Sequence, residues 1–153
     1  MARARRRRRK TRQAPVRRRR TDVPKPTRAE ALLLTLAQEL AGVPLDGALR
    51  KLAAAFAPSA DLPREVFGAW IRSRKDKAAS LALSWAREQL RLSLEETIAR
   101  APREARRAVS LGPDALAWLL LAACEAIAHE PPSAAADRVR TVVELSGHAA
   151  TSG

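Results

Sequence analysis

The sequence predicts an all-α protein. Apolar side chains recur at helical spacing, capping and helix-ending residues flank those stretches, and no strand-like alternation lasts long enough to suggest a sheet. Of the 153 residues, 46% are hydrophobic, which suits one compact domain or two small ones that share a core. A multidomain enzyme is excluded by this length.

The first predicted helix covers residues 27–42. Thr27 can cap its start, and Glu30 follows at the spacing of a capping box. We expect Gly42 to end the helix, because glycine is favoured just beyond a helix C-terminus. The leucines at helical spacing predict a buried face made of Leu32, Leu33, Leu36 and Leu40.

A proline-rich break separates two further predicted helices. The break is APSADLP, residues 57–63, and the helices are expected at 48–56 and at 63–70. Pro63 suits a first helical turn. The inner side of the earlier helix is predicted to hold Leu49, Leu52 and Phe56.

Three more helices are predicted in the second half of the chain. One runs from the polar cluster RSRKDK, residues 72–77, to about residue 100, before Pro102; the others cover 113–129 and 133–146, the last ending near Gly147. Pro131 and Pro132 separate the last two. Their expected inward-facing side chains are Leu81, Trp85, Leu90, Leu94, Ile98, Leu116, Leu119, Leu120, Ala123, Ile127, Val139, Val142, Val143 and Leu145.

Positive charge is concentrated in the first 28 residues. This arm holds 14 basic side chains and one acid, Asp22, so it carries the whole net charge of +13, while 15 basic and 15 acidic residues cancel in the rest of the chain. With few apolar side chains and blocks of like charge, the arm is expected to be disordered when free. It predicts nucleic-acid contact, and neutralising about eight phosphates would give a log–log salt slope near −7. A solvated tail or a nuclear or nucleolar address is the alternative.

The order of the first helices is typical of a DNA-binding unit. A short third helix behind a proline-rich turn, next to a cationic arm, can enter a major groove. The run ADLPREVFGAWIRSRKDK, residues 60–77, resembles the helix-turn-helix of TetR-family regulators, and residues 27–42 and 49–56 resemble the family's first two helices. Gly68 stands where the family usually has an aromatic residue, and Arg72 where it has proline. The chain is also shorter than a usual member.

The resemblance implies a domain organisation and partners. It implies a helix-turn-helix domain at 29–77, a dimerisation and effector domain at 78–147, and a tail at 148–153. The protein would bind double-stranded DNA as a homodimer, acting as a repressor under the control of a small hydrophobic effector. Phe67 would take a core position. The apolar helices 115–127 and 139–145 predict the dimer contact, and Trp85 and Trp118 are predicted either to be core residues or to line an effector cavity.

The predicted DNA-contacting residues lie in the third helix, in the linker after it and in the arm. Arg64 could donate two hydrogen bonds to a guanine, about 1–3 kcal/mol of discrimination, while the basic residues after it would bind phosphates. Arm arginines could follow the backbone or enter a minor groove. The full set is Arg64, Glu65, Gly68, Trp70, Arg72, Ser73, Arg74, Lys75, Lys77, Arg5, Arg6, Arg7, Arg8, Arg9, Arg17, Arg18, Arg19 and Arg20. The alternative is a charged surface of an ordinary helical bundle, because Glu65 and Asp76 dilute the cluster.

The sequence shows no motif for metal binding, disulfide formation or catalysis. Cys124 is the only cysteine, which excludes an intramolecular disulfide and a cysteine zinc site and indicates a reducing cytosol. We expect it to be a small buried hydrophobe. His129 and His148 form no metal motif, and no catalytic or cofactor-binding pattern is present, so we expect neither an enzyme nor a cofactor. The longest apolar stretch, residues 115–128, is too short to span a membrane. The predicted location is the bacterial cytoplasm, in association with the nucleoid.

Two readings from other classes stay open. The first is an architectural or packaging protein that coats nucleic acid through its arm, while the helical body oligomerises. The second is a protein-interaction module that the arm merely localises.

Overall fold

The described part of the chain, residues 25–102 and 111–144 of the computed structural model, is built from six α-helices without strands. The all-α prediction is therefore confirmed. The helices are α1 (Arg28–Leu40), α2 (Leu45–Ala55), α3 (Asp61–Ser73), α4 (Lys77–Arg100), α5 (Pro113–Ile127) and α6 (Pro132–Glu144). The predicted end of the last helix at 145–147, the tail at 148–153 and the arm before Lys25 lie outside the described residues.

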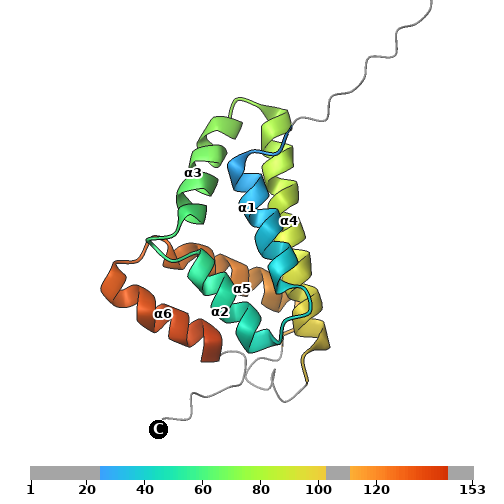
Figure 1. Cartoon of the computed structure of the whole chain (residues 1–153), viewed down its shortest axis with the longest axis vertical. Coiled ribbons are helices and arrows are strands. Elements are labelled where there is room, and N and C mark those ends of the chain that lie inside the picture. Colours follow the sequence, from blue (N-terminus) through green and yellow to red (C-terminus); the bar gives the residue numbers. More distant parts are fainter. Residues whose placement is uncertain (1–24, 103–110, 145–153) are drawn as a thin grey trace, which may run out of the picture.

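The helices form two groups that meet along α4. α1, α3 and α4 follow the long axis of the molecule, with α3 at one edge, and α2, α5 and α6 cross below them (Figure 1). α4 packs against both α1 and α5. Two of its hydroxyl groups bind carbonyl oxygens of α1: Ser93 Oγ donates to Ala37 at 2.6 Å and Thr97 Oγ1 donates to Leu40 at 3.3 Å. These bonds hold the two helices side by side.

Local capping fixes where the helices begin. Thr27 Oγ1 accepts from the Glu30 amide at 3.3 Å, and the Thr27 amide donates to Glu30 Oε2 at 3.1 Å, so the predicted capping box is confirmed. Asp76 caps α4 by accepting from the amides of Ala78 and Ala79. α1 ends at Leu40, and Gly42 follows with φ of 79°, a left-handed conformation that glycine adopts without steric cost.

α3 is longer than the sequence pattern predicted. It begins at Asp61, two residues before Pro63, and continues three residues past Trp70. Proline is tolerated here because the first four amides of a helix have no intrahelical acceptor. α2 likewise begins earlier, at Leu45, directly after Pro44.

One hydrophobic core joins helices from both sides of residue 77. The predicted core is confirmed at most positions, including Leu33, Leu49, Leu90, Leu120 and Val142. Cys124 is fully buried, as expected, and this burial raises the pKa of its thiol to about 12.

Several side chains that were expected inside are exposed. Trp85 and Trp118 keep 57% and 53% of their surface exposed, and Leu81 and Leu119 are exposed as well. The prediction of these four as core residues is wrong for the single chain. Leu81 and Trp85 lie on the side of α4 opposite Leu83, Ala86 and Leu90, which supply the buried face. Successive residues are about 100° apart on a helix, so a second apolar stripe points away from the core.

Candidate nucleic-acid interface

α3 presents one face to the core and a mixed face to solvent. Leu62, Ala69 and Ser73 are buried against the body. On the opposite side Arg64, Gly68 and Ile71 follow one another at intervals of four and three residues, with Arg64 and Ile71 exposed, and Lys75 is exposed in the turn after the helix. The helix lies at the edge of the molecule (Figure 1), so this outer face is accessible along its length.

Four charged residues form an ion cluster at the N-terminal end of α3. Asp61 accepts from Arg28 Nη2 at 2.8 Å and from Arg64 Nη2 at 3.0 Å, and Arg28 lies 3.7 Å from Glu65. Arg28, the last basic residue of the predicted arm, is the first residue of α1 and ties α1 to α3. The predicted base-reading residue Arg64 is exposed, yet one of its donors is already used by Asp61.

Aromatic side chains form the flank of α3. The Phe67 and Trp70 rings stack with centroids 6.3 Å apart and planes inclined by 28°. The Arg74 guanidinium lies over the Trp70 ring, 5.6 Å from its centroid. Phe67 is mostly exposed, so the core position that the resemblance implied for it is wrong. The cation at Arg74 is consequently held beside an apolar surface.

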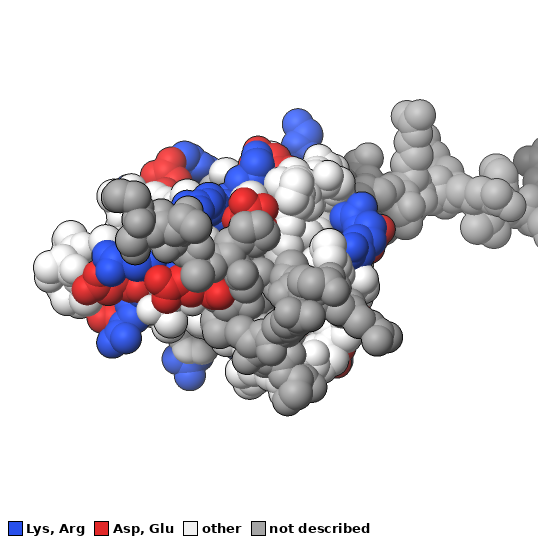
Figure 2. Space-filling view, turned by 90° about the horizontal axis from the view of Figure 1, so that it is seen from below, with Lys and Arg blue, Asp and Glu red and all other residues white. Residues whose placement is uncertain are grey.

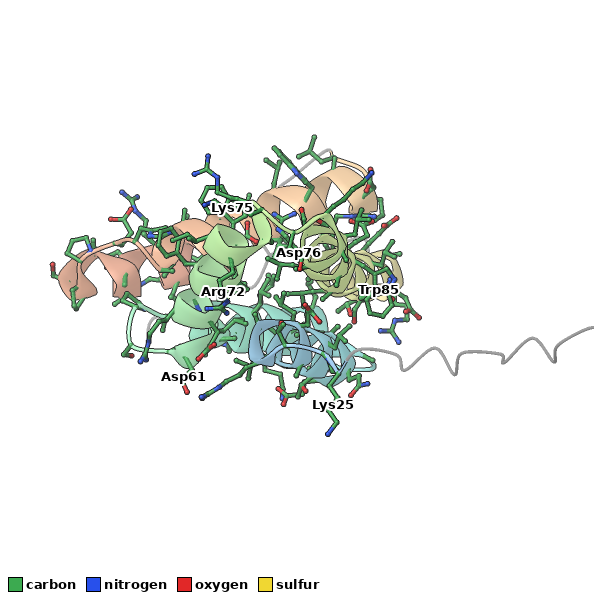
Figure 3. All side chains as sticks on the ribbon, turned by 90° about the horizontal axis from the view of Figure 1, so that it is seen from above. Lys25, Asp61, Arg72, Lys75, Asp76 and Trp85 are labelled. Carbon is green, nitrogen blue, oxygen red and sulfur yellow. The ribbon has the colours of Figure 1, made fainter. Side chains whose placement is uncertain are left out.

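The remaining predicted residues of this region differ in accessibility. Ser73 is buried and donates its hydroxyl to the Trp70 carbonyl at 2.8 Å, so it does not reach the surface that the prediction gave it. The Arg72 guanidinium lies against Gly68. Lys75 lies beside the capping residue Asp76 (Figure 3). Lys75 and Lys77 are both exposed, and Glu65 is half-buried. The structure therefore places five of the predicted basic residues on α3 and in the segment between α3 and α4, and it excludes Ser73 from this surface. The five are Arg64, Arg72, Arg74, Lys75 and Lys77.

The charges of the body are interspersed with opposite charges. In the view from below, basic and acidic side chains of the described residues alternate over short distances (Figure 2). The predicted arm residues, Arg5 to Arg9 and Arg17 to Arg20, lie outside the described residues.

Trp85 and Trp118, the predicted effector-site residues, are both more than half exposed. Trp85 borders a depression together with Lys25 and Asp76, on the side of α4 away from α3 (Figure 3). An apolar cavity of about 310 Å³ lies instead where α3 meets α4 and α5. Its lining includes Phe56, Val66, Phe67, Trp70 and Leu83. No sequence pattern marked this cavity, because its walls come from helices far apart in the chain.

A bidentate ion pair closes one side of this cavity. Arg87 Nε donates to Glu125 Oε1 at 2.6 Å and Arg87 Nη2 donates to Glu125 Oε2 at 2.8 Å, which joins α4 to α5. Hydrogen bonding to Glu125 raises the pKa of Arg87 above its ordinary value, against the opposing effect of partial burial. His129 lies at the rim, and the cavity therefore combines an apolar body with a polar end.

The described residues contain neither a metal-binding cluster nor a membrane-spanning helix. No three histidine, cysteine, aspartate or glutamate side chains gather there as a metal site would require. Within the same residues, none of the helices combines the length and apolar character needed to cross a bilayer.

Comparison with protein-family models finds no match to the chain, and comparisons with curated proteins and with solved structures find none either.

Proposed function

We propose that this chain is a DNA-binding regulator of transcription that acts as a homodimer. The observation that carries the proposal is the separation of charge: +13 in the first 28 residues, ahead of a body whose charges cancel. Such an arm supplies sequence-independent affinity for phosphates. The proposal places the protein at the bacterial nucleoid, as a repressor in the manner of the TetR-like regulators that residues 60–77 resemble.

α3 is the proposed reading helix. Its outer face is exposed at the edge of the body, and a single helix fits the major groove of B-DNA, which is about 12 Å wide. Arg64 would contact base edges, and Arg72, Arg74, Lys75 and Lys77 would bind phosphates. For Arg64 to make two bonds to a guanine, it has to release Asp61 or use its other donors, since a guanidinium carries five N–H groups.

The cavity between α3, α4 and α5 is the proposed effector site. A volume of about 310 Å³ lies at the lower end of the range of small-molecule pockets, and the lining favours a small hydrophobic compound. Because Val66, Phe67 and Trp70 of α3 form part of the wall, an occupant would contact the proposed reading helix directly.

The second candidate function is non-specific coating of nucleic acid by the arm. The cluster of Arg28, Asp61 and Arg64 favours it, because an arginine held by a carboxylate contributes less to base reading. In that case α3 would be an ordinary surface helix and the body would serve only for assembly.

Salt-titrated anisotropy, after selection of binding sites from genomic fragments, separates the two candidates. The full chain is compared with a form lacking residues 1–24, which keeps the Thr27 cap of α1, and with the double variant Arg64→Ala, Arg74→Ala. A matched control is Arg138→Ala, Arg140→Ala, which removes two exposed arginines from α6.

A regulator predicts that one sequence is enriched, that the truncated form keeps this preference, and that only the α3 double variant loses it. A coating protein predicts that no sequence is enriched and that binding disappears with residues 1–24. Equal effects of the two double variants would refute the role of α3.

A further inference from the structure

The basic side chains that form no ion pair gather at one end of the body. Among the described residues, salt bridges engage Arg28, Lys51, Arg64, Arg87, Arg91, Arg138 and Arg140. Most of the others lie where α3 ends, α4 begins and the chain enters α1, which is one end of the molecule (Figure 1). We call this set the basic end: Lys25, Arg72, Arg74, Lys75 and Lys77. The arm joins the body here.

The two carboxylates nearest the basic end are occupied by backbone amides. Asp76 Oδ1 accepts from the amides of Ala78 at 2.9 Å and Ala79 at 3.1 Å, and Glu30 Oε2 accepts from the Thr27 amide at 3.1 Å. Both carboxylates stand at helix N-termini, where the partial positive charge of the helix offsets their own. The basic end therefore keeps its positive charge for an anionic partner.

An apolar depression of about 520 Å³ adjoins the basic end, between the starts of α1 and α4. Lys25, Asp76 and Trp85 border it (Figure 3). Its lining also includes three alanines of α4, at positions 78, 79 and 82. Lys77 lies two helical turns before Trp85, about 12 Å along the helix axis and within about 80° around it. A flat apolar ring and a row of anions can thus both be accommodated here.

Trp85 differs from the other two tryptophans in its surroundings. Its indole is 57% exposed, and within residues 25–102 and 111–144 neither a ring nor a cation packs on it. The ring of Trp70 already contacts a phenylalanine and an arginine of the same helix. Trp118 lies one helical turn from the carboxylate of Asp114. Trp85 is therefore the tryptophan that offers an open ring face next to cations that no carboxylate engages.

We propose that Trp85 is a stacking site for an unpaired base of single-stranded DNA, with Lys25 and Lys77 binding the flanking phosphates. Stacking of bases on aromatic side chains beside a positively charged groove is the usual mode of single-strand binding. The alanine side chains offer no partner to a 2′-hydroxyl, so deoxyribose fits this lining better than ribose. The site goes beyond the proposed function, because a base inside a duplex is stacked on its neighbours and cannot reach Trp85.

The test measures the anisotropy of fluorescein-labelled 12-mers with the full chain. The ligands are oligodeoxyuridine, an abasic deoxyribose strand that keeps the phosphates and lacks the bases, and oligouridine, which adds only the 2′-hydroxyl. Raised salt weakens the phosphate contacts of the arm, so that the effect of the bases becomes measurable. The wild type is expected to bind oligodeoxyuridine more tightly than either of the other strands.

The variant Trp85→Ala isolates the base contact. It is expected to raise the dissociation constant for oligodeoxyuridine about 5- to 100-fold and to leave that for the abasic strand unchanged, because stacking on one aromatic side chain has this size. Trp118→Ala, at another half-exposed tryptophan, is the matched control and is expected to change neither value. Unchanged helical circular dichroism verifies that both variants are folded.

The double variant Lys25→Gln, Lys77→Gln isolates the phosphate contacts. It is expected to weaken binding of both deoxyribose strands and to reduce the log–log salt slope by about 1.4, since each phosphate contact contributes about 0.7 on a single strand. Arg138→Gln, Arg140→Gln, which removes two arginines already paired on α6, is expected to leave the slope unchanged.

Fluorescence reports the stacking directly. Trp70→Phe combined with Trp118→Phe leaves Trp85 as the only tryptophan of the chain. Oligodeoxyuridine is expected to quench its emission, because a stacked base quenches an indole, whereas the abasic strand is expected to leave it unchanged.

Three results would overturn the inference. They are equal affinity of the wild type for oligodeoxyuridine and the abasic strand, unchanged oligodeoxyuridine binding by Trp85→Ala, and oligouridine binding as tight as that of oligodeoxyuridine. Selection of duplex sites with the same preparations keeps the proposed function separate. An enriched duplex sequence without a base effect at Trp85 overturns the stacking site alone. A base effect at Trp85 without any enriched sequence supports the stacking site and overturns the regulator.

Discussion

The packing of α4 on α5 can be measured through the ion pair between Arg87 and Glu125. The two hydrogen bonds of 2.6 and 2.8 Å are parallel and bidentate, and the two side chains keep 37% and 31% of their surface exposed. We propose a double-mutant cycle with Arg87→Met, which keeps most of the aliphatic stem, Glu125→Gln, which keeps the shape of the carboxylate, and the pair of both.

The expected coupling free energy is about 1.5 kcal/mol. Fully exposed ion pairs contribute about 0.2–1 kcal/mol, while bidentate charge-assisted bonds are roughly twice as strong as neutral ones. Partial burial places this pair above the exposed range. It stays below the 3–5 kcal/mol of a broken buried pair, because water still reaches a third of each side chain.

The assay is urea unfolding at neutral pH, with the four proteins compared at a common slope. The pair of Arg140 and Asp137 on α6 serves as the control cycle, since its bond of 2.9 Å joins side chains that are 64% and 70% exposed. We expect a coupling of no more than about 0.5 kcal/mol there. A coupling for Arg87 and Glu125 that does not exceed the control would refute the reasoning.

Three further predictions concern the core and the charges of α4. Leu121→Ala should lower the free energy of unfolding by about 2–5 kcal/mol, because Leu121 is completely buried, whereas Ile71→Ala at an exposed position should cost less than about 0.5 kcal/mol; equal losses in urea would contradict the assigned core. Burial raises the pKa of the Cys124 thiol to about 12, so at pH 8 Ellman's reagent should modify it only after unfolding, and rapid reaction of the native protein would disprove its burial. Hydrogen bonding to Arg91 lowers the pKa of Glu88, so its stabilisation should be complete above the ordinary glutamate pKa of about 4.3 and should fade as the pH falls through the lower folded-state value. The stability difference between the wild type and Glu88→Gln should therefore shrink in acid, and a constant difference across the titration would be incompatible with this pairing.

The features that the sequence predicted well are local ones. Thr27 and Glu30 are three residues apart, so their capping box is visible in the sequence, and Gly42 marks the end of α1 for a similar reason. The all-helical class follows from many such signals. The position of Trp85 could not be predicted, because α4 carries apolar residues on two sides and only the packing of α1 and α5 decides which side is buried.

In the candidate site, too, the local features were predictable from the sequence and the long-range contacts were not. The basic residues of α3 are apparent from their spacing, and Arg64 lies one helical turn from its partner Asp61. The bond between Arg28 and Asp61 spans 33 residues and depends on how α1 packs against α3, so the sequence could not reveal it. The burial of Ser73 depends in the same way on the body that α3 contacts.

The anchoring of Arg28 has a consequence for the geometry of the proposed DNA complex. Its side chain binds Asp61 at the end of α3 where Arg64 emerges, so the arm and the helix share a point of attachment. The 24 residues before Lys25 can extend no further than about 85 Å, which corresponds to about 25 base pairs of duplex.

In the proposed complex, contact of α3 with DNA would present every phosphate within that radius to the arm at an effective concentration near the millimolar range. Binding of the arm first would raise the effective concentration of DNA at α3 in the same way. The contacts made by the arm and by α3 would then strengthen each other over a distance set by the length of the arm. A protected footprint would extend outward from the Arg64 end of α3, and by no more than the arm's contour length.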